Sequence, residues 1–120
     1  MNQAENSIDY IELPLSNAGA TKAFYSAVFG WEFQDWGPDY LSFSGAGVDG
    51  GFNRELDSAA EGVGPMVVLY SDRLEEKISA IARAGGRVSK ATYGFPGGER
   101  FHFIDPNGNE VLVWRQVAGA

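Results

Sequence analysis

The feature that most constrains this chain is an order of elements that occurs twice. In each half, a strand pattern is followed by a helical pattern that ends at a glycine, and the two glycines, Gly30 and Gly85, lie 55 residues apart. Three short strand patterns follow each glycine. A unit of under about 60 residues would leave one sheet face uncovered, so two units should pack together. We therefore predict a single domain over residues 1–120, with an α+β fold in which two βαβββ modules pair around a concave cleft.

Module one is predicted over residues 8–56. Its first strand runs from residue 8 to 15, and Ile11 and Leu13 on it share one face. Either Ser16 or Asn17 caps the helix that ends at Gly30. The later strands are expected at residues 31–36, at residues 39–44 and near residue 52.

Module two is predicted over residues 65–116, after a polar linker at residues 57–64. Its first strand covers residues 65–71 and is rich in β-branched side chains. The helix should begin near Ser71 or Asp72 and end at Gly85 and Gly86. Its later strands are expected at residues 87–92, 100–104 and 110–115.

Composition removes several functional classes. The chain has no cysteine, which excludes disulfides and thiolate sites. Nine basic and sixteen acidic residues give a net charge of −7, which argues against nucleic acid as a partner and favours a neutral or cationic ligand, or solubility alone. Without a long apolar run or a signal-peptide pattern, we expect a cytoplasmic protein that does not bind a membrane.

Five short motifs, taken in order, are similar to those of a known family. They are Phe24-Tyr25, Phe29-Gly30-Trp31, Ala84-Gly85-Gly86, Phe95-Pro96-Gly97-Gly98 and the segment from Phe103 to Glu110. In this combination the chain resembles the vicinal-oxygen-chelate superfamily (glyoxalase/bleomycin resistance protein/dioxygenase-like). The resemblance implies the glyoxalase/bleomycin resistance/dihydroxybiphenyl dioxygenase fold. Residues 105–108 are of the types that form turns, so this segment needs no catalytic role. Phe24 and Tyr25 are interpreted as core residues.

The resemblance also implies four positions at which metalloenzymes of the family hold a divalent ion. In this sequence they are Tyr10, Met66, Leu112 and either Ser42 or Ser44. None of these is a usual ligand, and a chain with one histidine cannot form a centre with two. We therefore expect no metal and no other cofactor. A divalent metal would be expected only if these positions are wrongly assigned, since Glu12 and His102 together would make a weak site.

Two side chains are candidates for catalysis. Glu12 shares a strand face with Tyr10, so it is either a general base, an anchor for a ligand or a carboxylate satisfied by neighbouring donors. His102 stands between Phe101 and Phe103 and should point away from the face they pack, either as a proton shuttle or as a hydrogen-bonded wall residue. The residues expected to bind a substrate, or else to form ordinary core, are Tyr10, Glu12, Met66, Val68, Tyr70, His102, Leu112 and Trp114.

Three functions follow from the resemblance. The first is a glyoxalase-like protein that binds a small organic molecule in the cleft without a metal and could act as a lyase or isomerase. The second is a sequestering protein of the bleomycin-resistance type, and the third is a metal-dependent lyase like lactoylglutathione lyase. A homodimer is expected because relatives commonly pair and because open sheet edges need covering. Whether the modules pair within one chain or between two chains stays open.

Overall fold

The two predicted modules are present in the computed structural model, which describes residues 3–117. Residues 1–2 and 118–120 of the predicted domain lie outside the described residues. Module one consists of β1 (Tyr10–Pro14), α1 (Ala18–Phe29), β2 (Glu32–Asp35), β3 (Tyr40–Ser44) and β4 (Asp49–Asn53). Module two consists of β5 (Val67–Tyr70), α2 (Leu74–Arg83), β6 (Arg87–Phe95), β7 (Gly98–Ile104) and β8 (Glu110–Gln116).

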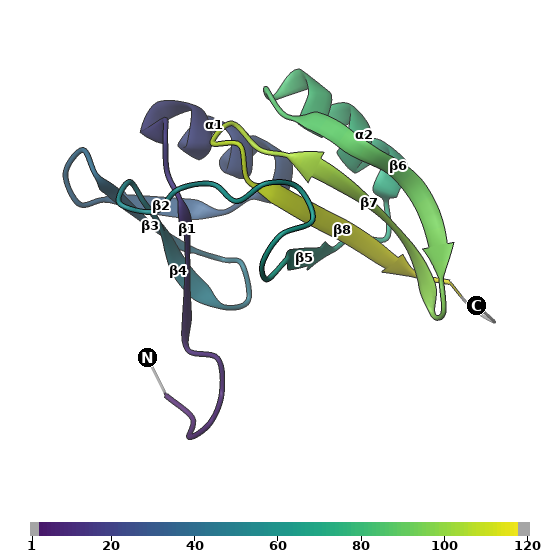
Figure 1. Cartoon of the computed structure of the whole chain (residues 1–120), viewed down its shortest axis with the longest axis horizontal. Helices are drawn as coiled ribbons and strands as arrows, with labels where there is room; N and C mark the ends of the chain where they lie inside the picture. Colours follow the sequence, from purple (N-terminus) through teal and green to yellow (C-terminus); the bar gives the residue numbers. More distant parts are fainter. Residues whose placement is uncertain (1–2, 118–120) are drawn as a thin grey trace.

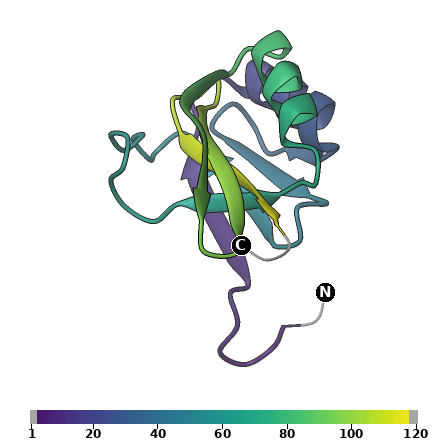
Figure 2. The same cartoon turned by 90° about the vertical axis from the view of Figure 1, so that its right-hand side faces the viewer.

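Each module forms its own four-stranded mixed sheet. The strand orders are β1-β4-β3-β2 in sheet A and β5-β8-β7-β6 in sheet B. The first strand of each module pairs in parallel with the last one, and the other pairs are antiparallel. In Figure 1 both helices lie along the same side of the two sheets, and in Figure 2 the linker bulges out on the other side. The predicted α+β fold with two packed modules is confirmed.

Local signals set the helix ends. Asn17, one of the two predicted caps, accepts a hydrogen bond at Oδ1 from the backbone N–H of Ala20 (2.9 Å). Gly30 ends α1 in the left-handed conformation, with a φ of 74°. The sequence predicted that α2 begins near Ser71 or Asp72, but the helix begins at Leu74. The Oγ of Ser71 accepts from the N–H of Arg73, which makes a turn before the helix begins.

The hairpin of β6 and β7 is longer than predicted. Phe95 pairs with Gly98, so only Pro96 and Gly97 form the turn between the strands. Gly97 has a φ of 108°, which a two-residue hairpin turn readily uses. Pro96 and Gly97 were correctly predicted to form a turn. Phe95 and Gly98, on either side of them, belong to the paired strands.

Aromatic packing joins the modules. Phe24 on α1 is fully buried, and its ring lies 5.7 Å from that of Phe103 in sheet B. A Cβ on Gly86 would lie 2.8 Å from the Phe24 ring, so the end of α2 has room for this ring only because residue 86 is glycine. Tyr25 stacks on Trp31 at 4.6 Å. The predicted core role of Phe24 and Tyr25 is confirmed by their burial.

A buried polar turn also links the modules. The Tyr25 hydroxyl donates to Asp105 Oδ2 (2.8 Å), and Asp105 Oδ1 accepts from the N–H groups of Asn107 (2.8 Å) and Asn109 (2.9 Å). Burial raises the pKa of Asp105, and these hydrogen bonds oppose the rise. Burial, reinforced by the nearby Asp105 charge, also raises the pKa of Tyr25. The turn is therefore structural, as its sequence indicated.

Asn107 attaches this turn to the beginning of α1. Its Oδ1 accepts from the backbone N–H groups of Ser16 (2.8 Å) and Asn17 (3.2 Å) and lies 3.0 Å from the Thr21 hydroxyl.

In the part of the chain that the structure describes, neither helix is long and apolar enough to cross a membrane.

Replacing Asn107 by Ala should leave the Ser16 and Asn17 donors without their acceptor. Each of these partly buried hydrogen bonds contributes roughly 0.5–1.5 kcal/mol, so the free energy of unfolding should fall by about 1–3 kcal/mol. Urea unfolding followed by tryptophan fluorescence measures the change. Gln34→Ala, at an exposed position of β2, is the control, and equal stability of the two variants would contradict the assigned role.

Candidate functional site

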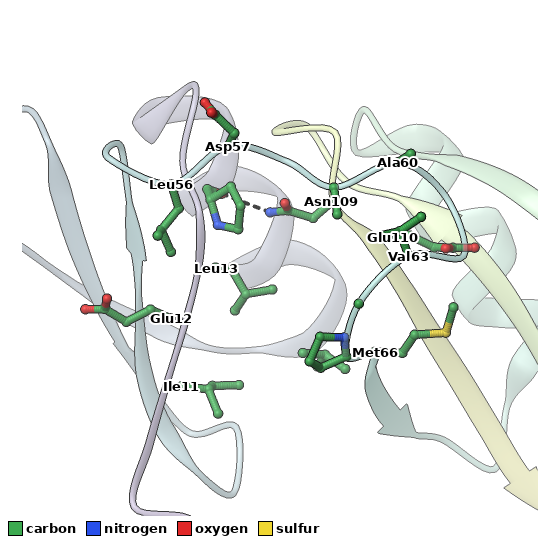
Figure 3. A pocket seen from close by; sticks show the side chains of 15 residues that line it. Ile11, Glu12, Leu13, Leu56, Asp57, Ala60, Val63, Met66, Asn109 and Glu110 are labelled. Atoms are coloured by element: carbon green, nitrogen blue, oxygen red, sulfur yellow. Dashed lines mark hydrogen bonds between the residues drawn. The ribbon is translucent and has the colours of Figure 1, made fainter.

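A pocket of about 480 Å³ lies between the two modules. Its walls come from β1, from the linker and from the beginnings of β5 and β8 (Figure 3). The lining residues are Ile11, Glu12, Leu13, Pro14, Leu56, Asp57, Ala59, Ala60, Val63, Gly64, Pro65, Met66, Val67, Asn109 and Glu110. The pocket is thus mainly apolar.

One wall of the pocket is β1, an edge strand of sheet A. Figure 3 shows the side chains of Ile11 and Leu13 extending from β1 toward Met66, whereas Glu12 points to the opposite side. Strand alternation explains this arrangement, since neighbouring side chains leave the backbone in opposite directions. Glu12 therefore borders the pocket with its backbone while its carboxylate lies on the outer face of sheet A.

The linker forms the roof of the pocket and is tied down at two points. The Ser58 hydroxyl donates to the backbone oxygen of Asn107 (2.8 Å), and the N–H of Gly62 donates to Glu110 Oε1 (2.6 Å). An exposed ion pair between Glu61 and Arg87 (3.4 Å) adds a weaker contact. The linker thus lies along module two and covers one side of the pocket.

The Glu12 carboxylate is held by neighbouring donors. The Tyr40 hydroxyl donates to Oε2 (2.7 Å), and the Asn53 amide donates to Oε1 (3.2 Å). Because the Tyr40 proton is used in this bond, Tyr10, whose hydroxyl lies 2.6 Å from that of Tyr40, must be the donor of their shared bond. Partial burial, followed by the bonds to Tyr10 and Glu12, raises the pKa of Tyr40.

Gly51 makes room for this contact. It lies directly opposite Glu12 in the ladder between β1 and β4. A Cβ at Gly51 would lie 2.1 Å from the Tyr40 hydroxyl oxygen. The absence of a side chain therefore allows Tyr40 to cross β4 and reach Glu12.

His102 is part of a second hydrogen-bonded chain, in sheet B. Its Nδ1 lies 2.7 Å from Glu110 Oε2, and because a carboxylate only accepts, Nδ1 is the donor. In the neutral imidazole, Nε2 therefore accepts from the Tyr93 hydroxyl (2.7 Å), which itself accepts from Arg100 Nε (2.6 Å). The hydrogen bond from His102, with a further one from Gly62, lowers the pKa of Glu110 against the opposing effect of burial.

The residues predicted to bind a substrate fall into two groups, one in each sheet. In sheet B, Leu112 pairs with both Val68 and His102, and Tyr70 pairs with Trp114. Glu12 and Met66 lie at the pocket between the modules. Tyr10 is exposed on sheet A, and Val68 and Tyr70 are exposed on sheet B. The remaining three lie within sheet B, where His102 and Leu112 are buried and Trp114 packs edge-on against Tyr70 at 5.0 Å. The two catalytic candidates, Glu12 and His102, lie in different sheets.

Sequence reasoning missed several residues of these arrangements. Tyr40 and Glu110 were not predicted as partners, and the linker was taken only as a connection. The short loop between β7 and β8 did contain a signal, because it places Glu110 two pairs away from the His102–Leu112 pair and so on the same face of the sheet. No local pattern indicated that Tyr40 reaches Glu12, since that contact depends on Gly51.

The side chains at the four implied metal positions do not fit a divalent ion. Tyr10 supplies a hydroxyl bound to Tyr40, Met66 a thioether and Leu112 no donor at all, while Ser42 Oγ accepts from the Trp36 indole N–H (2.9 Å). Within residues 3–117, no three His, Asp or Glu side chains are grouped as metal ligands. The donor set thus lacks the imidazoles and carboxylates that such ions prefer.

Solved structures with the same fold come from several bacteria. A glyoxalase-related enzyme from Fulvimarina pelagi has a TM-score of 0.73 and 18% identity, covering 92% of this chain and 88% of that one. A glyoxalase/bleomycin resistance protein/dioxygenase family enzyme from Burkholderia phytofirmans PsJN has a TM-score of 0.75 and 18% identity, with coverages of 91% and 98%. For TioX from Micromonospora sp. ML1 the values are 0.68 and 15%, with coverages of 93% and 100%.

These identities support the shared fold and nothing more specific. No curated protein matches the sequence significantly. The profile of the Glyoxalase/Bleomycin resistance protein/Dioxygenase superfamily, however, matches residues 7–113, which are most of the chain. The resemblance carried by the sequence motifs is thereby confirmed, and the chain belongs to this superfamily.

Proposed function

We propose that this protein binds a small organic molecule in the pocket between its modules and does so without a metal ion. The observation that carries the proposal is the pocket itself, whose volume of about 480 Å³ lies within the roughly 300–1,000 Å³ of ligand sites. Its walls combine an apolar surface with a few polar groups, as small-molecule sites commonly do. The unsuitable side chains at Tyr10, Met66 and Leu112 support a binding mode that needs no ion.

Binding is favoured over lyase or isomerase chemistry by the state of the two catalytic candidates. The Glu12 carboxylate points away from the pocket and already accepts two hydrogen bonds. Both ring nitrogens of His102 are engaged, by Tyr93 and by Glu110. A general base must reach the proton that it removes, and neither side chain faces the pocket freely.

Sequestration, as in the bleomycin-resistance type, is the second candidate. None of the described residues that line the pocket is basic, whereas Glu12, Asp57 and Glu110 are acidic. A carboxylate-bearing substrate such as a glutathione conjugate would therefore find no cationic partner in this pocket. This observation counts against a reaction like that of lactoylglutathione lyase.

A homodimer is part of the proposal. Large apolar side chains are exposed on or beside both sheets, among them Tyr10 (43%), Trp36 (65%), Val68 (43%) and Tyr70 (50%). Exposed large apolar groups of this kind are typical of interaction surfaces. Two copies packed through these faces would cover them.

Filling the pocket should abolish binding. In an NMR screen with a chemically mixed fragment library, hits should shift the signals of Ile11, Leu13 and Val63, and a chelator should leave these shifts unchanged. Ala60→Trp, in the roof, should remove them because the indole takes the ligand's place. Ala82→Trp, at an exposed position of α2, is the matched control, and hits that survive Ala60→Trp would contradict the proposed site.

Replacing Glu110 by Gln should loosen the roof and flatten the acid dependence of stability. The pKa of Glu110 is lowered in the folded protein, so its ionised form stabilises the fold above its usual value near 4.5, and this contribution is lost as the pH falls below that value. The variant should lack this loss when free energies of unfolding are compared between about pH 3 and pH 7.

The same Glu110→Gln variant should also show faster amide exchange at Gly62. Glu75→Gln, which makes the same replacement on the exposed surface of α2, serves as the control for both measurements. An acid dependence identical in the two variants would show that the bonds to His102 and Gly62 do not stabilise the fold.

The oligomeric state can be measured directly. Light scattering on the purified protein should give twice the mass of one chain, and Tyr70→Glu should shift the mass toward that of a monomer because it places a charge on the exposed apolar face of β5. Ser79→Glu, on the helical side of the molecule, should have no effect. A monomer at high concentration would contradict the dimer.

A further inference from the structure

We infer that the ligand of the pocket between the modules is a short, uncharged peptide with apolar side chains, which pairs as an added strand with the free edge of β1. This inference rests on the proposed function, because it names the chemical class of ligand for the same pocket. It depends on the backbone groups of β1 that face the pocket, on the apolar side chains beside them and on the bonds that the polar side chains already make.

One edge of β1 faces module two instead of another strand. The N–H of Leu15 donates to the backbone oxygen of Asn53 (3.1 Å), so Leu15 faces β4. Successive residues of a strand turn their backbone groups to opposite sides, so the C=O of Pro14 and both backbone groups of Glu12 point away from β4. The Asn109 amide of module two donates to that Pro14 oxygen (2.9 Å; Figure 3). The free edge of β1 therefore points toward module two.

Glu12 is the residue of this edge whose backbone has no partner. It lines the pocket, and within residues 3–117 no group accepts from its N–H or donates to its C=O on this side. Pro14 has no N–H, and its C=O is taken by Asn109. A ligand that fills the pocket displaces water from the Glu12 backbone, and leaving these groups without partners is unfavourable. The ligand should therefore carry a matching donor and acceptor.

A peptide strand supplies this donor and acceptor within one residue. In a hydrogen-bonded pair of antiparallel strands, two facing residues exchange both bonds. The ligand residue that faces Glu12 then has its side chain on the outer side of the sheet. The residues before and after it place their side chains beside Ile11 and Leu13, which extend toward Met66 in Figure 3. The ligand should therefore be apolar at alternate positions.

The pocket also limits the length of the ligand. Four consecutive residues of β1, from Ile11 to Pro14, line it. At about 3.3 Å per residue they span roughly 13 Å, which is close to the length of an extended tripeptide with blocked ends. Ala60 and Val63 of the linker would cover such a peptide and remove its apolar surface from water.

The ends of the peptide should be uncharged. Both oxygens of Glu110 already accept hydrogen bonds, from His102 and from Gly62. The Glu12 carboxylate points away from the pocket. None of the described residues that line the pocket is basic. A free ammonium or carboxylate end would therefore lose hydration among the apolar walls without gaining an ionic partner.

Three matched tripeptides test the inference. They are acetyl-Val-Ala-Val-amide, the same peptide N-methylated at its alanine, and the same peptide N-methylated at its third residue. The alanine N–H should donate to the Glu12 oxygen, whereas the N–H of the third residue points away from β1. In calorimetric titrations, methylation at alanine should weaken binding about tenfold, and methylation at the third residue should weaken it less than about threefold.

The protein side of the pair is tested with two variants of one residue. Glu12→Pro and Glu12→Ala both remove the carboxylate, but only proline also removes the N–H, and an edge strand tolerates proline on its free side. Glu12→Pro should bind the unmethylated peptide about tenfold more weakly than Glu12→Ala. In the unsubstituted protein, the peptide should also slow amide exchange at Glu12. If Glu12→Pro does not fold, the methylated peptides and this exchange still provide the test.

The outcomes separate this inference from the proposed function. Equal affinities of the two methylated peptides, with shifts at Ile11 and Leu13, would overturn strand pairing and leave the pocket as the binding site. Failure of all three peptides, with fragments from the mixed library still bound at these signals, would overturn the peptide class alone. Loss of every ligand at these signals would overturn both proposals.

Discussion

The bonds made by Asp105 are the contact on which the joining of the two modules depends. A buried carboxylate is unfavourable unless it is hydrogen-bonded, and here Tyr25 and the backbone of the turn supply the donors. Asn107 extends the same turn to the first residues of α1. Since Asn109 and Glu110 follow directly in the chain, these bonds also fix the position of one wall of the pocket.

The pocket follows from how the sheets end. β1 and β5 are edge strands, and among residues 3–117 no ladder joins one sheet to the other. The space between these edges is lined by apolar residues of β1 and covered by the linker, which Glu110 holds through Gly62. His102, the only histidine of the chain, thus supports the roof through Glu110.

The order of elements was predictable because its signals are local. Alternation of Ile11 and Leu13 with polar neighbours indicated β1, and Gly30 and Gly85 indicated the helix ends. The ladder beyond Phe95 was missed because the length of a hairpin depends on its partner strand. The start of α2 was misplaced because the Ser71 hydroxyl bonds to the backbone of a turn and does not cap the helix.

The sequence by itself determined the two modules, the family, the aromatic core and the unsuitability of Tyr10, Met66 and Leu112 as metal ligands. These properties depend on residue type and on spacing along the chain. Only the tertiary structure decided that Glu12 turns away from the pocket toward Tyr40, that His102 is held by Glu110 and that the linker forms a roof. Such contacts join residues distant in sequence, and their geometry depends on local space, as at Gly51, which no periodicity encodes.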